Sequence, residues 1–180
     1  MPGLGLMDQF HEHAEAGDFE TVLPRNSHHR ADLFVHLGGP MMLRDGYETM
    51  SMSGKRTVPI IEGLKPEDHR FVYYYVIYPN LLLSPHPDYV LTHTAWPIAP
   101  GRTKIICEFL FTQEALARPD FDPTDMVEFW DVTNRQDWGL CERVQHGAQS
   151  RGFRPGPYQP SEDCVHTFDR WYAAHMAALL

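Results

Sequence analysis

Alternation of side chains with a period of two predicts β-strands in the middle of the chain. The segment RFVYYYVIY (70–78) is dense in β-branched and aromatic residues, which favours a strand with both faces at least partly covered. DYVLTHTAWPI (88–98) and RTKIICEFLFT (102–112) follow, separated only by a short turn-forming segment. Strands joined by short turns indicate an antiparallel meander.

Weaker patterns flank these strands. YETMSMSG (47–54) alternates and predicts another strand, and NLLLS (80–84) predicts a short continuation of the strand before it. Residues 1–45 show no clear period, so we expect mostly loop there, with one short helix near 7–16.

Apolar spacing of three and four residues predicts two helices in the last third of the chain. The first covers about 124–147, and Asp122 and Thr124 are candidates to cap its start. The loop at 152–160 contains three prolines and cannot be helical, and a second helix covers 161–177. The pattern predicts an α+β fold, in which the helices pack on one face of a curved antiparallel sheet.

A carboxylate interrupts the inward-facing stripe of the long predicted helix. Asp137 shares that stripe with Trp130, Thr133, Cys141 and Val144. Because an unpaired carboxylate on a buried face is unfavourable by several kcal/mol, we expect Asp137 to face a cavity between helix and sheet. The residues alone leave open what it meets there: a metal ion, an arginine or backbone N–H donors. The arginines available are Arg102, Arg135 and Arg143.

Composition narrows the class of protein. The 180 residues, 43% of them hydrophobic, suit one domain, and the net charge of −9 argues against nucleic acid or an anionic membrane as the main partner. No stretch of about 18 apolar residues predicts a membrane span. Three widely separated cysteines form neither a disulfide framework nor a paired metal motif, which favours the cytoplasm.

The segment QDWGLCERVQHGAQS (136–150), together with PNLLLSPHPDYVLTHTAWPIAPGRTKIICEFLF (79–111), resembles the C-terminal catalytic domain of Rieske-type oxygenase α subunits. The branch it resembles acts on quaternary ammonium compounds such as choline, glycine betaine and carnitine. The resemblance implies a helix-grip fold of the START-like kind, with a long C-terminal helix packed on the sheet. It predicts a catalytic-like domain at 38–180 after a divergent segment at 1–37, and makes Asp137 the carboxylate ligand of a mononuclear Fe(II).

The chain departs from that family in two respects. Cys-x-His occurs once, at Cys164 and His166 in the second predicted helix, but Cys-x-x-His does not occur, so the ligand set of a Rieske cluster is incomplete and we expect no [2Fe-2S] cluster in this chain. It also lacks the histidine pair, spaced His-x4-His, that supplies the other two iron ligands in the family. His11 and His13 are candidates to replace that pair, but a solvated pair is the simpler interpretation. The ligand set implied for iron is therefore incomplete.

The resemblance implies O2-dependent hydroxylation or N-demethylation of a small substrate, by a truncated or diverged domain that is not self-sufficient. Expected partners are the substrate and a Rieske-containing paralogue or a reductase, with a homo-oligomer as a further candidate. The competing hypothesis is a non-catalytic small-ligand-binding or assembly subunit with the same cavity and no metal. No residue is assigned a catalytic role, and the residues expected to bind substrate are Tyr75, His93, Trp96 and Phe109.

Overall fold

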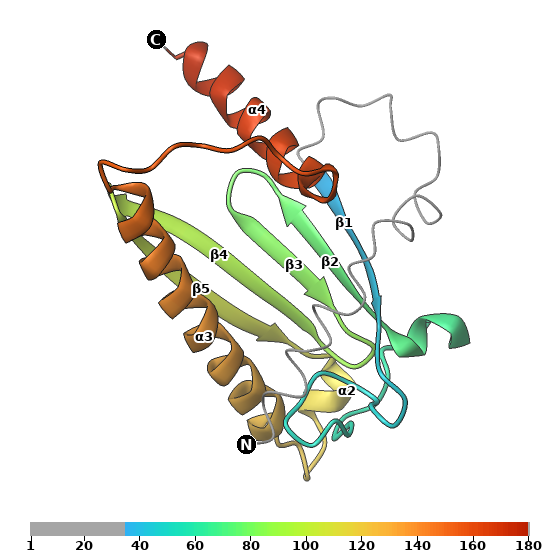
Figure 1. The fold of residues 1–180 in the computed structure, drawn as a ribbon. Coiled ribbons are helices and arrows are strands. Elements are labelled where there is room, and N and C mark those ends of the chain that lie inside the picture. The colour runs from blue at the N-terminus through green and yellow to red at the C-terminus, as the bar shows by residue number, and fades with distance from the viewer. Residues whose placement is uncertain (1–34, 180) are drawn as a thin grey trace.

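A five-stranded antiparallel sheet forms the centre of the molecule, and helices lie against it (Figure 1). The structure is a computed structural model that describes residues 35–179. The strands follow one another in the sheet in chain order, so the topology is the predicted meander. Their bounds are β1 Val35–Met42, β2 Phe71–Ile77, β3 Leu81–Pro85, β4 Val90–Ala99 and β5 Arg102–Leu110.

Helical segments come between β1 and β2 and after β5 in the chain. A 3-10 helix, η2 (Pro66–Arg70), precedes β2, and a short α2 (Gln113–Leu116) follows β5. The long α3 (Thr124–Ala148) lies along the β4–β5 side, while η3 (Pro160–Glu162) leads into α4 (Asp163–Ala177) near β1 (Figure 1). The α+β fold and both predicted helices are confirmed.

Strand register gives the sheet two different sides. On β4 and β5, His93 pairs with Cys107 and Leu91 with Phe109, and these side chains lie on the side that α3 contacts, called here the helix-facing side. The neighbouring pairs lie on the opposite, outer side; they are Thr92 with Glu108, Thr94 with Ile106 and Trp96 with Lys104. Alternate residues of a strand therefore face opposite sides of the sheet, and only those on the helix-facing side can share a site with α3.

The predicted strand at 47–54 is wrong, because this segment is a folded loop. Thr49, Met50 and Ser51 are consecutive and all almost fully buried, so burial does not alternate as a strand requires. The loop closes where Glu48 N–H donates to the Gly54 carbonyl over 2.8 Å. Gly54 has a φ of 71°, and a Cβ there would lie 2.3 Å from the Tyr47 ring, so only glycine fits.

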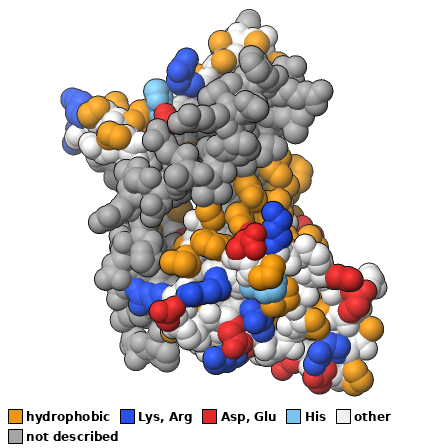
Figure 2. Space-filling view, turned by 90° about the vertical axis from the view of Figure 1, so that its right-hand side faces the viewer, with side chains coloured by type: hydrophobic (Ala, Val, Ile, Leu, Met, Phe, Trp, Pro, Cys, Tyr) orange, Lys and Arg blue, Asp and Glu red, His pale blue; other side chains and the backbone are white. Residues whose placement is uncertain are grey.

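The segment after Pro79 also differs from expectation. Leu81–Pro85 does not continue β2 but reverses and pairs with it antiparallel, Leu81 opposite Ile77 and Leu83 opposite Tyr75. The expected helix at 7–16 lies outside the described residues. Seen from the side of β1, the described surface mixes exposed hydrophobic groups with charges of both signs (Figure 2).

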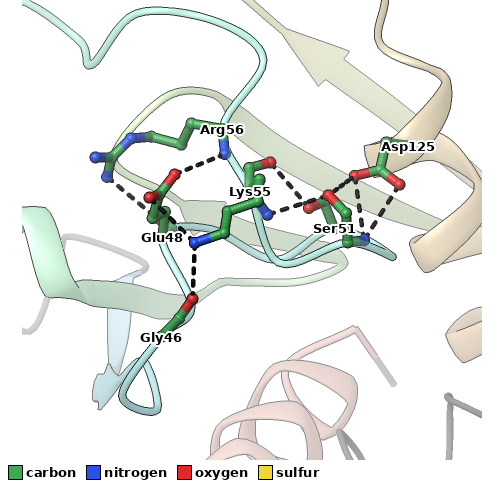
Figure 3. Close-up of polar contacts among 7 residues, drawn as sticks. Gly46, Glu48, Ser51, Lys55, Arg56 and Asp125 are labelled. Atoms are coloured by element: carbon green, nitrogen blue, oxygen red, sulfur yellow. Dashed lines mark hydrogen bonds and ion pairs between the residues drawn. The ribbon is translucent and has the colours of Figure 1, made fainter.

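Polar contacts attach the 47–56 loop to the start of α3 (Figure 3). The Asp125 carboxylate accepts hydrogen bonds from Ser53, one from Oγ at 2.5 Å and two from the backbone N–H at 3.2 Å. Glu48 accepts from Lys55 Nζ and from the Arg56 backbone N–H. Met50 in this loop joins the core between α3 and the sheet, whose other members are Leu43, Val58, Val72, Tyr89, Leu91, Ala115, Met126, Phe129 and Trp130.

Candidate functional site

Two side-chain hydrogen bonds connect α3 to β4 and its start. Trp130 Nε1–H donates to the Tyr89 hydroxyl over 2.8 Å, and that hydroxyl donates to the Met50 carbonyl over 2.8 Å. One turn later on the helix, Asn134 Oδ1 lies 3.0 Å from His93 Nε2. Because an amide oxygen only accepts, this contact places the imidazole proton on Nε2. The Trp130–Tyr89 and Asn134–His93 hydrogen bonds fix which face of α3 packs on the sheet.

His93 is the half-buried centre of a small polar group. Its partner Asn134 also donates from Nδ2 to Cys107 Sγ, at 3.7 Å. Burial lowers the pKa of His93, while the Asn134 hydrogen bond and the negative charge of Asp137 act in the opposite direction. Asp137 follows Asn134 by three residues on α3, and helical spacing therefore places its carboxylate on the same side of the helix as the site.

Asp137 is exposed, contrary to the expectation that it faces a closed cavity. Of its stripe neighbours only Trp130 and Thr133 are buried, whereas Cys141 and Val144 are exposed. Packing of α3 on the sheet stops at Asn134, and the ends of β4 and β5 at the same level are exposed as well. Within residues 35–179, Asp137 makes no hydrogen bond or ion pair, and its side chain is open to solvent.

The four residues expected to bind substrate do not lie together. His93 and Phe109 are on the helix-facing side of neighbouring strands. Trp96 is half-exposed on the outer side, opposite Lys104. Tyr75 is also on the outer side, because it pairs with Leu83, whose partner on β4 is Thr92. A single cavity lined by all four is therefore ruled out by the register, and the substrate role of His93 and Phe109 stays a prediction.

The described residues do not fit a complete iron site. A mononuclear Fe(II) of the expected kind needs two imidazoles and a carboxylate on one face. Within residues 35–179 there is no group of three His, Cys, Asp or Glu side chains that could hold a metal ion. Asp137 is one suitable donor, and His93, whose Nε2–H is given to Asn134, could offer only Nδ1, so the two residues together are one donor short of the expected set. The role of Asp137 as an iron ligand stays a prediction.

A second polar group, deeper in the fold, was not predicted. Asp88 is fully buried; its Oδ1 accepts a 2.6 Å bond from Thr49, its Oδ2 has no hydrogen-bond partner among the described residues, and burial raises its pKa to about 6. His86 donates from Nδ1 to the Ser84 carbonyl, stacks on Tyr89, and has its pKa lowered by burial to about 3. The sequence held one indication of this buried group: Asp88 is the sole Asp, Glu, Lys or Arg between positions 70 and 102.

These features define a class: an α+β domain in which a long helix, hydrogen-bonded across an antiparallel sheet, presents a carboxylate beside a histidine at the open end of the sheet. No described helix is both long enough and apolar enough to cross a membrane. The sequence model of a family described as ring hydroxylating alpha subunit (catalytic domain) matches residues 7–178. The chain belongs to this family, the α-subunit catalytic domains of ring-hydroxylating, Rieske-type oxygenases.

Individual relatives agree with the branch that the sequence resembles. The chain is 32% identical over 144 residues to the glycine betaine monooxygenase oxygenase subunit of Pseudomonas aeruginosa, covering 76% of this chain and 32% of that protein. It is 25% identical over 134 residues to the chloroplastic choline monooxygenase of Spinacia oleracea, covering 71% and 30%. Putrescine 2-hydroxylase of Ralstonia nicotianae is 31% identical over 101 residues, covering 53% and 27%. The chain thus spans about a third of the length of these relatives.

Proposed function

We propose that the chain forms the carboxylate-bearing part of an oxygenase catalytic domain, with Asp137 as one ligand of a mononuclear iron. The activity proposed is O2-dependent hydroxylation or N-demethylation of a small quaternary ammonium compound, since the relatives include glycine betaine and choline monooxygenase subunits. The observation that carries the proposal is the position of Asp137. Its carboxylate lies on the His93 side of α3, one turn beyond Asn134, and is open to further donors.

The described residues have a positioning function in this proposal. The Trp130–Tyr89 and Asn134–His93 hydrogen bonds hold α3 in one rotation on the sheet, and a rigid helix then fixes the direction of Asp137. Because no set of three donors lies within residues 35–179, the remaining donors come from other segments of polypeptide. Electrons come from a separate Rieske cluster and a reductase.

The substrate in this proposal lies against the helix-facing side of the sheet. His93 and Phe109 are there, on adjacent strands and beside α3, so they are the predicted residues that can share a site with Asp137. Tyr75 and Trp96 are left out because they lie on the other side of the sheet.

The experiment joins this chain to the upstream part of the Pseudomonas aeruginosa relative that precedes the matched region. The fusion is loaded with Fe(II) without oxygen and its iron is measured after desalting. Beyond any iron that the upstream part holds by itself, we expect one iron per chain to be retained by the fusion and lost in Asp137→Ala, because the carboxylate is a ligand. Asp131→Ala is the matched control: Asp131 is an exposed acid of the same helix, paired with Arg135 over 2.8 Å, and its loss should leave iron unchanged.

Two outcomes would contradict the proposal. Equal iron in the fusion and in Asp137→Ala, with both folded by circular dichroism, would remove Asp137 from the site. A folded fusion with no more iron than the upstream part alone would favour the competing hypothesis, a small-ligand-binding or assembly subunit. Turnover of glycine betaine with a reductase then tests the substrate separately from the metal.

A further inference from the structure

His93 stands where α3 ceases to cover the sheet. Its cross-strand neighbours are Cys107 on β5 and Leu82 on β3, so all three side chains lie on the helix-facing side. Asn134 of α3 contacts both His93 and Cys107, and the helix lies along the β4–β5 side (Figure 1). Leu82, on the other flank of His93, is 43% exposed. A small molecule can therefore approach the half-buried imidazole from the β3 side, while α3 holds the ring from the β5 side.

The Asn134 amide bridges two strands, and its two ends differ. Its carbonyl Oδ1 lies 3.0 Å from His93 Nε2, and its Nδ2 donates to Cys107 Sγ over 3.7 Å. With the amide in this orientation the imidazole proton is on Nε2, because an amide oxygen only accepts. Burial lowers the pKa of His93 from its ordinary value, so the ring is neutral at neutral pH and Nδ1 carries a lone pair.

The place of Nδ1 follows from the shape of the ring. Nδ1 is bonded to the carbon that joins the imidazole to the chain, whereas Nε2 is at the far end and reaches α3. Nδ1 therefore lies close to the surface of the sheet. Trp130 packs against the ring, with the two centroids 5.9 Å apart, and Leu82 flanks it on β3. A polar atom placed beside apolar side chains in this way orients a small ligand through one hydrogen bond.

We propose that Asn134 is a positioning residue that keeps the His93 proton on Nε2, so that Nδ1 accepts a hydrogen bond from an O–H or N–H group of the substrate. This inference rests on the proposed function, because it takes the helix-facing side of the sheet as the substrate site. It narrows the substrate to a small cation that carries a hydroxyl or amine donor. A carboxylate in the same place would set lone pair against lone pair.

The tautomer can be measured in the full chain by NMR of isotope-labelled histidine, in which the two ring nitrogens give separate signals. The sample is kept at about pH 8, above the ordinary pKa of imidazole, and His93→Gln assigns the His93 signals. We expect a protonated Nε2 and an unprotonated Nδ1 in the wild type. A wild type with the proton on Nδ1 would overturn the inference, because Asn134 would then present its amine to the ring.

Substitutions separate positioning from a general structural role. Asn134→Leu has a similar size but no acceptor, so we expect His93 to populate both tautomers. Asn134→Asp keeps an acceptor oxygen and should keep the proton on Nε2. Trp130→Phe is the matched control, because it removes the Trp130–Tyr89 hydrogen bond between α3 and the sheet and should leave the tautomer unchanged. An unaltered tautomer in Asn134→Leu would contradict the positioning role.

A matched pair of ligands tests Nδ1 as the acceptor. Choline and ethyltrimethylammonium carry the same cationic group, and choline adds a hydroxyl. At millimolar concentrations we expect choline to shift the Nδ1 signal of His93 toward that of a hydrogen-bonded nitrogen, and to bind about tenfold more tightly than ethyltrimethylammonium. The preference should shrink in Asn134→Leu. Equal affinities in the wild type, or an Nδ1 signal that choline does not move, would overturn the inference. Neither readout involves iron or turnover, so this failure is distinct from a failure of the proposed iron site.

Discussion

The two halves of α3 have different surroundings. In the first half the inward residues are buried and joined to the sheet by hydrogen bonds; they are Met126, Phe129, Trp130, Thr133 and Asn134. In the second half, from Arg135 to Ala148, no residue is buried, and Trp138 is 41% and Val144 61% exposed. One continuous helix therefore passes from a packed core to an open surface within a single turn.

This difference separates stability from function along one element. The first half carries the contacts that determine the rotation of α3. The second half carries Asp137, whose carboxylate is exposed and contributes little to folding. A group that meets donors from elsewhere has to be accessible, and a rigid helix anchored one turn earlier gives it a fixed direction.

The largest expected effect is on the packed half. Trp130→Ala removes a buried ring and its hydrogen bond to Tyr89, so the free energy of unfolding should fall by about 3–5 kcal/mol. Trp138→Ala, the same substitution two turns later, should change it by less than about 1 kcal/mol because the ring is exposed. Urea denaturation followed by circular dichroism measures both. Similar losses in the two variants would show that the halves do not differ.

The next effect concerns two buried ionisable residues, Asp88 and His86. Their contributions to stability depend on pH in opposite directions. The pKa of Asp88 is raised from 3.8 to about 6, so its contribution to stability is complete at low pH and is lost as pH rises through 6. The pKa of His86 is lowered from 6.5 to about 3, so its contribution is present above pH 6.5 and is lost as pH falls. Between pH 4 and 6 the two dependences nearly cancel in the wild type.

Single substitutions should reveal each dependence. In Asp88→Asn, only His86 remains, and the free energy of unfolding should fall by about 1.4 kcal/mol for each pH unit below 6. In His86→Asn, only Asp88 remains, and stability should instead increase as the pH is lowered to about 4. Denaturant unfolding at a series of pH values measures both slopes. Flat profiles for both variants would refute these assignments.

A smaller effect is expected at the boundary between the halves. Asn134→Ala removes the last hydrogen bond between α3 and β4, and should lower the free energy of unfolding by about 1–2 kcal/mol. Hydrogen exchange should accelerate in residues 135–148, because their anchor is lost, and change little in residues 124–133. Uniform acceleration along α3 would mean that the helix unfolds as one unit and has no such boundary.

The smallest stability effect is expected in the exposed half. Asp137→Asn should change the free energy of unfolding by less than about 0.5 kcal/mol, since the side chain is exposed. It should also lower the pKa of His93, because the carboxylate charge now raises that pKa. NMR titration of the His93 imidazole measures the change, and Asp131→Asn, on the same helix, should leave it unaltered. An unchanged His93 pKa in Asp137→Asn would place the carboxylate away from the site.

The residue pattern predicted β2, β4, β5, α3 and α4. The buried-face explanation fits the first half of α3, whereas β2 has no exposed residue and α4 has no buried one. The pattern failed at 47–54, where tertiary contacts bury consecutive side chains, and at Leu81–Pro85, where a chain reversal looks like a continuation. It also extended the buried stripe of α3 past Asn134, because a sequence does not show where a helix leaves its sheet.

The candidate site was partly predictable. The motif resemblance selected Asp137, and the comparison with known proteins confirmed the family and its quaternary ammonium branch. Tyr75 and Trp96 were expected to bind substrate together with His93 because all three are strand residues with ring side chains. They lie on the other side of the sheet from His93, and this depends on the register between strands, which the sequence does not show. The Asn134–His93 contact joins residues 41 positions apart, and no local pattern indicates it.

In the proposed function, this chain offers one carboxylate, Asp137, to an iron site whose other donors lie outside these 180 residues. The most direct measurement is the iron content of the purified 180-residue chain after anaerobic loading with Fe(II) and desalting, in wild type and in Asp137→Ala. We expect well under one iron per chain in both, because a single carboxylate cannot hold Fe(II) tightly. One tightly held iron per wild-type chain, lost in Asp137→Ala, would contradict it. The missing ligands would then lie among this chain's own histidines: His11, His13, His86 and His93.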